Sequence, residues 1–338
     1  ADYVALLKAV RETARSVDPE AKIVSGAHVY SGEISAFVEE VLRTGREHFD
    51  IGGLHCHGPI ETLKPAIGAA LKAWKAAGIE KPIWVDEAGL PVDPADPQGE
   101  MTKADTVAKK VVYSRFMGMG NYTWFIFRHI PKSTTVAYDN FAALDAEGRV
   151  RPVVVAYNTL VRWLRQTKPV QEVDFQSQAD GYLFSRGLEK ILVVWSKNPE
   201  RSAFVSVTSV RRSNVLGAEE EVPAPNGKIT FPVSSSPVFL SIRDGDFVGF
   251  QGEDFIVLPD QIVHEAGKEV SCDLGVKGIF NDPVRGTWEI GRDESWSFEP
   301  SQKEMTLAPG GQENTRVTAR ATCVKTRRIS IMFSLSKY

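Results

Sequence analysis

Short apolar segments alternate with amphipathic helices over the first half of the chain, and this alternation limits the possible folds more than any other feature. Strand-like apolar runs occur at 22–26, 49–55, 82–87 and 121–128. Helical spacing of apolar residues predicts helices at 3–17, 34–42, 65–77, 103–117 and 152–165, with Pro65 in the first turn of the third. Such alternation is typical of a parallel sheet, and the repeat of roughly 35 residues has the length of one unit of a β/α barrel.

Beyond residue 169 the helical periodicity disappears, and short β-rich runs separated by turn residues take its place. The first group of strands is predicted at 182–184, 191–195, 203–207, 228–233 and 238–242. The second is predicted at 254–258, 268–275, 285–290, 303–307, 314–323 and 327–335. We therefore expect an α/β domain at 1–169, a β-sandwich at 170–243 and an immunoglobulin-like β-sandwich at 244–338.

The composition excludes several classes of protein. The 338 residues are 43% hydrophobic and 25% charged, and the net charge of −3 argues against a nucleic-acid partner. No apolar run approaches the roughly 18 residues of a membrane span. The chain begins Ala-Asp-Tyr without a recognisable signal peptide, so we expect a processed or truncated product. Cys272 and Cys323 lie in alternating segments, where either a disulfide or two buried thiols would fit.

Polar and aromatic side chains gather at the predicted carboxyl ends of the strands, where β/α barrels carry their functional groups. The apolar run at 82–85 ends in Asp86 and Glu87, and a carboxylate there needs a partner or a solvated cleft. We expect a pocket for a polar substrate lined by His28, His55, His57, Glu87, Trp124 and Arg128. Other interpretations fit two of these, because His28 suits a loop and Trp124 suits core packing. Asp86 is expected to face away from Glu87, since neighbours on a strand point to opposite faces.

Four stretches, in this order along the chain, resemble the second half of a clan A retaining glycoside hydrolase similar to family 39. They are DYVALLKAVRETARSVDPEAKIVSG, FDIGGLHCHG, KPIWVDEAGLP and the pair YTWFIFRH with DNFAALDAEGRVRPVVVAYNTL. The resemblance covers residues 2–164 and implies the last four units of a (β/α)8 (TIM) barrel. The β region that follows resembles the sandwich domains appended to such barrels, and the last 95 or so residues match only the general immunoglobulin-like pattern.

The resemblance implies that Glu87 is the nucleophile, with His55, His57, Trp124, Arg128 and His28 around a sugar of a β-linked oligo- or polysaccharide. Retaining hydrolysis needs no cofactor or metal but does need a second carboxyl group as acid and base. In this clan that glutamate ends the fourth strand as Asn-Glu, and no such pair stands at a strand end within residues 1–168. His57 replaces the family's usual tyrosine. The resemblance favours an extracellular or periplasmic enzyme.

Three further hypotheses remain open at this stage. The chain is expected to be weakly active or inactive unless the missing half is supplied, so self-association or a partner that completes the barrel is predicted. A non-catalytic carbohydrate-binding or scaffold protein would keep the histidines and aromatic residues without turnover. A metal hydrolase using His55, His57 and Glu87 is the third, although no further ligand pair has recognisable spacing.

Overall fold

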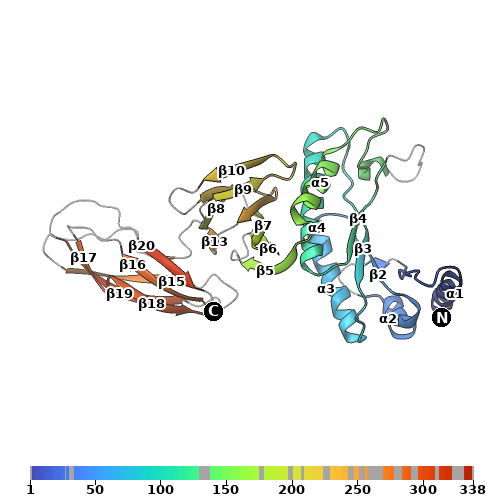
Figure 1. Ribbon diagram of the computed structural model, residues 1–338, viewed down its shortest axis with the longest axis horizontal. Helices are drawn as coiled ribbons and strands as arrows, with labels where there is room; N and C mark the ends of the chain where they lie inside the picture. The colour runs from blue at the N-terminus through green and yellow to red at the C-terminus, as the bar shows by residue number, and fades with distance from the viewer. Residues whose placement is uncertain are drawn as a thin grey trace.

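The computed structural model describes residues 2–26, 28–29, 34–128, 138–174, 179–196, 201–206, 209–223, 229–242, 247–250, 256–257, 269–277, 284–290, 296–308, 312–321 and 331–336. An α/β part, a β part and a second β part follow one another along the molecule (Figure 1). The alternatives for Cys272 and Cys323, a disulfide or two buried thiols, stay open, because Cys323 and the side chain of Cys272 lie outside the described residues. No helix among the described residues is long and apolar enough to cross a membrane.

Four parallel strands form the sheet of the α/β part, in the order in which they occur along the chain. They are β1 (His28–Val29), β2 (Gly52–His55), β3 (Ile83–Ala88) and β4 (Asn121–Trp124). The strand predicted at 22–26 is reduced to one parallel bridge between Val24 and Ile51, and the named strand begins later. The prediction of a parallel sheet of four strands is thus confirmed, with its first strand displaced.

Five helices accompany this sheet and bury one of its faces. They are α1 (Asp2–Val17), α2 (Ala36–Thr44), α3 (Ile60–Ala76), α4 (Pro97–Phe116) and α5 (Pro152–Leu164), with short 3-10 turns η1 (Arg46–His48) and η2 (Tyr138–Phe141). Along β3, Val85 is fully buried in the core shared with the helices, whereas Trp84 and Asp86 are only partly buried. Asn121 and Thr123 of β4 are exposed. Among the described residues, the face of the sheet opposite the helices is therefore only partly covered.

Two predicted helix starts were wrong. The third helix begins at Ile60, because Ile60 and Leu63 already pack into the core, and Pro65 consequently lies inside the helix. The fourth begins at Pro97, where the side chain of Asp96 accepts a hydrogen bond from the Gln98 amide and caps the first turn.

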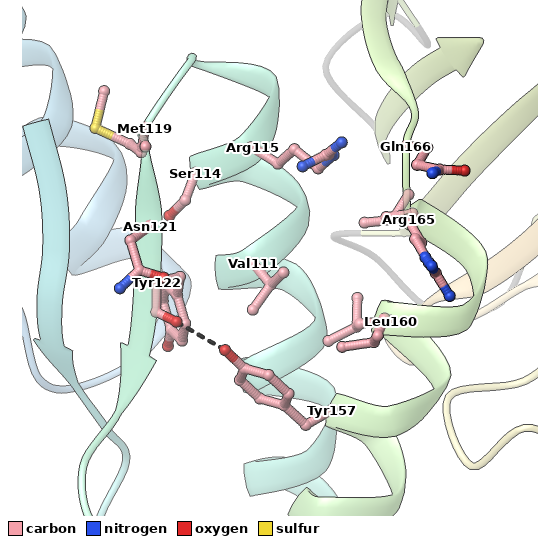
Figure 2. A pocket seen from close by; sticks show the side chains of 13 residues that line it. Val111, Ser114, Arg115, Met119, Asn121, Tyr122, Tyr157, Leu160, Arg165 and Gln166 are labelled. Atoms are coloured by element: carbon pink, nitrogen blue, oxygen red, sulfur yellow. Dashed lines mark hydrogen bonds between the residues drawn. The ribbon is translucent and has the colours of Figure 1, made fainter. Parts of the chain in front are cut away.

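Two hollows follow the outer edge of β4, which among the described strands pairs only with β3. One hollow, of 370 Å³, lies between β4 and the carboxyl-terminal ends of α4 and α5 (Figure 2). The other, of 610 Å³, continues toward Trp124 and Phe127. Tyr157 of α5 spans the gap by donating a hydrogen bond of 2.7 Å to the Tyr122 carbonyl. This edge thus has no described strand beside it and borders apolar space.

The first β part contains a six-stranded and a three-stranded antiparallel sheet. The larger has the order β10-β9-β12-β7-β6-β5, formed by β5 (Lys168–Asp174), β6 (Ala179–Arg186), β7 (Glu189–Ser196), β9 (Ser209–Ser213), β10 (Glu219–Pro223) and β12 (Val238–Ile242). The smaller has the order β11-β8-β13, formed by β8 (Arg201–Ser206), β11 (Ile229–Val233) and β13 (Phe247–Phe250).

The six-stranded sheet is buried on both faces. Tyr182, Phe184, Trp195 and Phe239 belong to the same apolar core as the α/β helices. Side chains of the alternate positions, such as Leu192, form a second core on the other face. This explains why β6 and β7 read as continuous apolar runs. The α/β part and this sheet share one apolar core. The domain boundary near residue 169 stays a prediction.

The second β part also consists of two antiparallel sheets. One has the order β14-β15-β19-β17, with β14 (Ile256–Val257), β15 (Glu269–Lys277), β17 (Trp296–Glu299) and β19 (Gln312–Ala321). The other has the order β18-β16-β20, with β16 (Val284–Ile290), β18 (Gln302–Leu307) and β20 (Ile331–Ser336). Val317 from one sheet and Trp288 from the other pack in a separate core, which makes this part a sandwich. Its immunoglobulin-like topology stays a prediction.

Candidate active site

Glu87 stands near the carboxyl end of β3 and faces two histidines, His55 at the end of β2 and His57 two residues beyond it. The His57 ring lies 2.9 Å from Glu87 through Nε2 and Oε1, which is hydrogen-bond distance. His55 Nδ1 lies 3.7 Å from the same oxygen. The Glu87 side chain is 30% exposed, so it is reachable from solvent. Three of the residues expected from the sequence therefore meet at one point.

Asp86 does not face away from this cluster, and that prediction was wrong. His55 Nε2 lies 3.7 Å from Asp86 Oδ1, so one imidazole faces both neighbouring carboxylates. The cause is an irregularity in β3, because Val85 pairs with Tyr122 but Ala88 pairs with Trp124, which leaves two residues of β3 opposite one residue of β4. Such a bulge breaks the alternation of strand side chains. Asp86 Oδ1 is buried and accepts no hydrogen bond from the described residues.

Two phenylalanines fix the His57 ring edge-on. Its centroid lies 5.4 Å from that of Phe125, just after β4, and 5.3 Å from that of Phe141 in η2. The two phenylalanine rings also contact each other, at 5.5 Å. Gly89 leaves the space for this packing, because a Cβ there would stand 2.8 Å from Phe141. The contacts with Phe125 and Phe141 orient the His57 ring so that its Nε2 points toward Glu87.

The turn that carries His57 is anchored by several hydrogen bonds. The Cys56 amide donates to the Glu87 carbonyl at 2.9 Å, and the Gly58 amide donates to the Gly89 carbonyl at 2.8 Å. Thr62 donates through its hydroxyl to the His57 carbonyl at 2.9 Å. Lys110 of α4, which is wholly buried, donates through Nζ to the Cys56 carbonyl at 2.9 Å.

The remaining predicted site residues are less closely associated with Glu87. Trp124 pairs with Ala88, donates through its indole nitrogen to the Phe141 carbonyl at 3.0 Å and lines the larger edge hollow. Arg128 is exposed, and its backbone pairs with Leu144. The backbone of His28 lies in β1 opposite Leu54, while its side chain is outside the described residues.

Sequence patterns did not indicate Phe125, Phe141 or Lys110 as parts of the site. Phe141 comes from a separate loop, and Lys110 reads as one more lysine on a helix, so neither carries a local signal. Within the part of the chain that the structure describes, no three or more His, Cys, Asp or Glu side chains form a group that could hold a metal ion. The metal-hydrolase hypothesis requires such a group.

No protein-family model matches the sequence, and no curated protein is significantly similar to it. Two solved structures with a similar fold are glycoside hydrolases. A family 39 glycoside hydrolase from the gut symbiont Bacteroides cellulosilyticus shares 19% identity over 71% of this chain, with a TM-score of 0.58. A family 86 β-porphyranase from Bacteroides plebeius shares 11% identity over 99% of this chain, with a TM-score of 0.52. The chain spans 54% of the length of the first enzyme and 74% of the second.

Proposed function

We propose that this chain, whose fold is that of glycoside hydrolases, carries the nucleophile half of a retaining active site for a β-linked glycan or glycoside. The observation that carries the proposal is the Glu87–His57 pair, with an interatomic distance of 2.9 Å, at the carboxyl end of a parallel strand. His55 and His57 both face Oε1. Oε2 is therefore the oxygen that would bond to the anomeric carbon.

Glu87 supplies only one of the two groups that retention requires. The mechanism needs a second carboxyl group about 5–5.5 Å from the nucleophile, to protonate the leaving oxygen and then to deprotonate water. We propose that the acid/base carboxyl comes from a complementary polypeptide segment that closes the partial TIM barrel. On this proposal Trp124, Arg128, His28 and the two histidines contact the sugar.

The surfaces beside the first and last strands support a complementary segment. At one end, Leu6, Val10 and Val17 of α1 are exposed. At the other end, the two hollows lie beside the free edge of β4, and Val161 of α5 is 51% exposed. Free strand edges next to apolar surface favour association. We expect the isolated chain to self-associate in sedimentation velocity, and a stable monodisperse monomer would contradict this.

A carbohydrate-binding protein without catalysis is the second candidate. This candidate is favoured because the described residues place one carboxylate, that of Glu87, beside both histidines and supply no acid/base partner for Glu87. Such a protein would bind sugar after Glu87→Gln as well as before, and it would not turn over activated glycosides.

The direct test uses a panel of 2-fluoro-glycosyl fluorides followed by peptide mapping of folded protein. Because fluoride departs without protonation, these reagents examine Glu87 even when the general acid is missing. We expect a stable adduct on Glu87, absent from Glu87→Gln and retained in Glu80→Gln, which alters an exposed carboxylate. If no sugar gives an adduct on folded wild-type protein, the carbohydrate-binding protein becomes the better supported of the two candidates.

A further inference from the structure

Lys110 is a fully buried cation directly behind the site. It lies on α4 with no exposed surface, between the helices and the end of β2. Burying an ammonium group is costly unless it is well partnered. Its Nζ donates to the Cys56 carbonyl at 2.9 Å. An apolar side chain of similar length would occupy the same space without this desolvation cost, so the charge requires another explanation.

The bond made by Lys110 falls at the junction of the two site strands. Cys56 separates His55 from His57, and its amide is already bonded to the Glu87 carbonyl at 2.9 Å. Lys110 therefore holds the peptide group that joins Cys56 to the histidine in contact with Glu87. The other anchors of this turn, from Thr62 and from the Gly58 amide, act at later residues and leave the Cys56 carbonyl to Lys110.

We propose that Lys110 is a positioning residue that holds the Cys56–His57 peptide so that the His57 ring meets Glu87. This inference rests on the proposed function for its chemical consequence, but not for its geometry. Lys110 has no contact with substrate and acts through the backbone. Loss of its bond would let the turn relax and move Nε2 away from Oε1, and displacements of about 1 Å at a reacting group can reduce rates by a hundredfold.

The arrangement also predicts a pH dependence. Burial lowers the pKa of Lys110 from 10.5 to about 8, opposed by the nearby Cys56 thiol and Glu61. On the far side of the Cys56 peptide the titratable groups are the two histidines with Asp86 and Glu87. A neutral amine donates a weaker hydrogen bond than an ammonium group does. Raising the pH through about 8 therefore loosens the turn, whereas a guanidinium at this position would stay charged.

The experiment compares wild type with Lys110→Met, Lys110→Arg and the control Lys109→Met, which removes the neighbouring lysine of the same helix. The first readout is the ¹⁵N chemical shift and tautomer signal of the His57 ring, assigned among the six histidines by substitution. The second is the rate of Glu87 labelling by an activated 2-fluoro-glycoside across pH. Circular dichroism establishes folding for each variant.

We expect Lys110→Met to change the His57 signals and to slow labelling roughly 10–100-fold below about pH 8. The labelling rate of wild type should decline above about pH 8, whereas that of Lys110→Arg should not. The labelling rate of Lys109→Met should follow that of wild type. Should Lys110→Met fail to fold, the wild-type and Lys110→Arg pH profiles decide alone. Unchanged His57 signals in Lys110→Met, or identical profiles for wild type and Lys110→Arg, would overturn the proposal. If no sugar labels wild type, the proposed function fails, and the His57 signals still test the positioning role.

Discussion

Gly89 lies beside Glu87 at a point where the packing leaves no space for a side chain. A Cβ there would overlap the Phe125 carbonyl oxygen and stand 2.8 Å from the Phe141 ring and 3.5 Å from His57 Nδ1. Because a backbone carbonyl cannot shift independently of its chain, Gly89→Ala should displace the Phe125 and Phe141 rings that pack against His57. We expect a loss of about 1–3 kcal/mol in the free energy of unfolding and slower labelling of Glu87.

Urea unfolding and labelling of the same preparation measure both effects. The matched control is Gly68→Ala in α3, where a Cβ would meet nothing within 4 Å. That change should stabilise the protein by about 0.5–1 kcal/mol and leave labelling unaltered. Equal effects of the two substitutions on unfolding and on labelling would contradict the role of Gly89 in leaving space for the rings around His57.

The burial of Lys110 also leads to a prediction about how stability depends on pH. The pKa of Lys110 is about 8 in the folded protein, against an ordinary value of 10.5. At a pH between these two values the unfolded chain therefore binds more protons than the folded protein does. Stability contributed by this group must then rise with pH across that interval. We expect the urea midpoint of wild type to rise between about pH 8 and pH 10 relative to that of Lys110→Met, which has no such group. Parallel pH dependences of the two proteins would contradict the burial of this cation.

Residues at strand ends could be predicted from the sequence, whereas those that orient them could not. His55, His57 and Glu87 stand where apolar runs stop, which is a local signal. Asp86 was placed on the wrong face because a bulge is set by pairing with a neighbouring strand, not by the run itself. Lys110 is 54 residues from Cys56, and only tertiary packing brings the two together.

At the scale of elements, the strands hardest to recognise are those stabilised by charge pairing instead of apolar alternation. β10 is Glu-Glu-Glu-Val-Pro and was not predicted, because its exposed face shows no hydrophobic pattern. Its partner β9 places Arg212 opposite Glu220, with which it forms an ion pair, and Arg211 of β9 pairs with Glu219 of β10. The start of α4 differs, because the sequence does contain a helix-start signal, Asp96 followed by Pro97, although the helix was predicted to begin only at residue 103.

A buried charged cluster joins the start of α4 to the segment before α5. Glu100, 7% exposed, accepts a hydrogen bond of 2.8 Å from Lys103, which has no exposed surface, and Arg151 lies 3.8 Å from the same carboxylate oxygen. Glu100→Ala would leave two buried cations without this carboxylate. We expect a loss of about 3–5 kcal/mol in the free energy of unfolding, measured by urea denaturation.

Two comparisons sharpen this prediction. Glu40→Ala removes the carboxylate of an exposed pair with Arg43 and should cost only about 0.3–0.5 kcal/mol. Glu100→Ala combined with Lys103→Met should recover part of the loss, because it also removes one of the two buried cations that face this carboxylate. A loss for Glu100→Ala no larger than that for Glu40→Ala would mean that water reaches the cluster.

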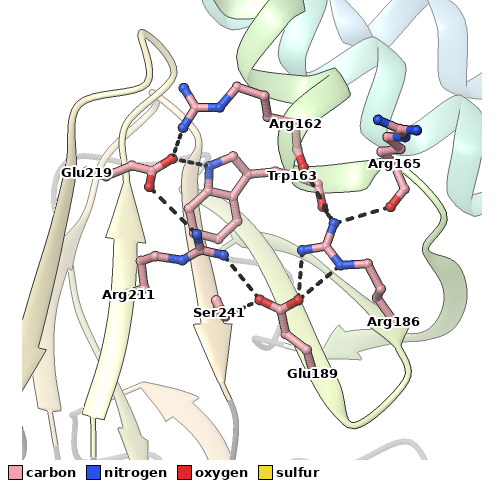
Figure 3. A network of polar contacts seen from close by, with 8 residues as sticks. All are labelled: Arg162, Trp163, Arg165, Arg186, Glu189, Arg211, Glu219 and Ser241. Atoms are coloured by element: carbon pink, nitrogen blue, oxygen red, sulfur yellow. Dashed lines mark hydrogen bonds and ion pairs between the residues drawn. The ribbon is translucent and has the colours of Figure 1, made fainter.

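At the scale of the molecule, a polar network links α5 to the six-stranded sheet (Figure 3). Glu189 accepts hydrogen bonds from Arg186 at 2.7 Å and from Ser241 at 2.5 Å, and Arg211 stacks over the Trp163 ring at 4.8 Å. Burial would raise the pKa of Glu189, but the hydrogen bonds from Ser241 and Arg186 and the charges of Arg186 and Arg211 bring it below its usual value. The network adds polar contacts to the apolar core that the two parts share.

A common core means that damage in the first β part should be felt at Glu87. Trp195 of β7 is 2% exposed and packs at 5.4 Å against Tyr182 in the core that includes the α/β helices. Trp195→Ala should therefore cost about 3–5 kcal/mol and lower the temperature at which the His57 signals disappear. Trp288→Ala, an equally buried change in the last sandwich, has a separate core and should leave that temperature unchanged. The measurement is NMR thermal melting with calorimetry of the same samples. Loss of the His57 signals at the wild-type temperature in Trp195→Ala would show that the α/β part melts independently of the sheet packed against it.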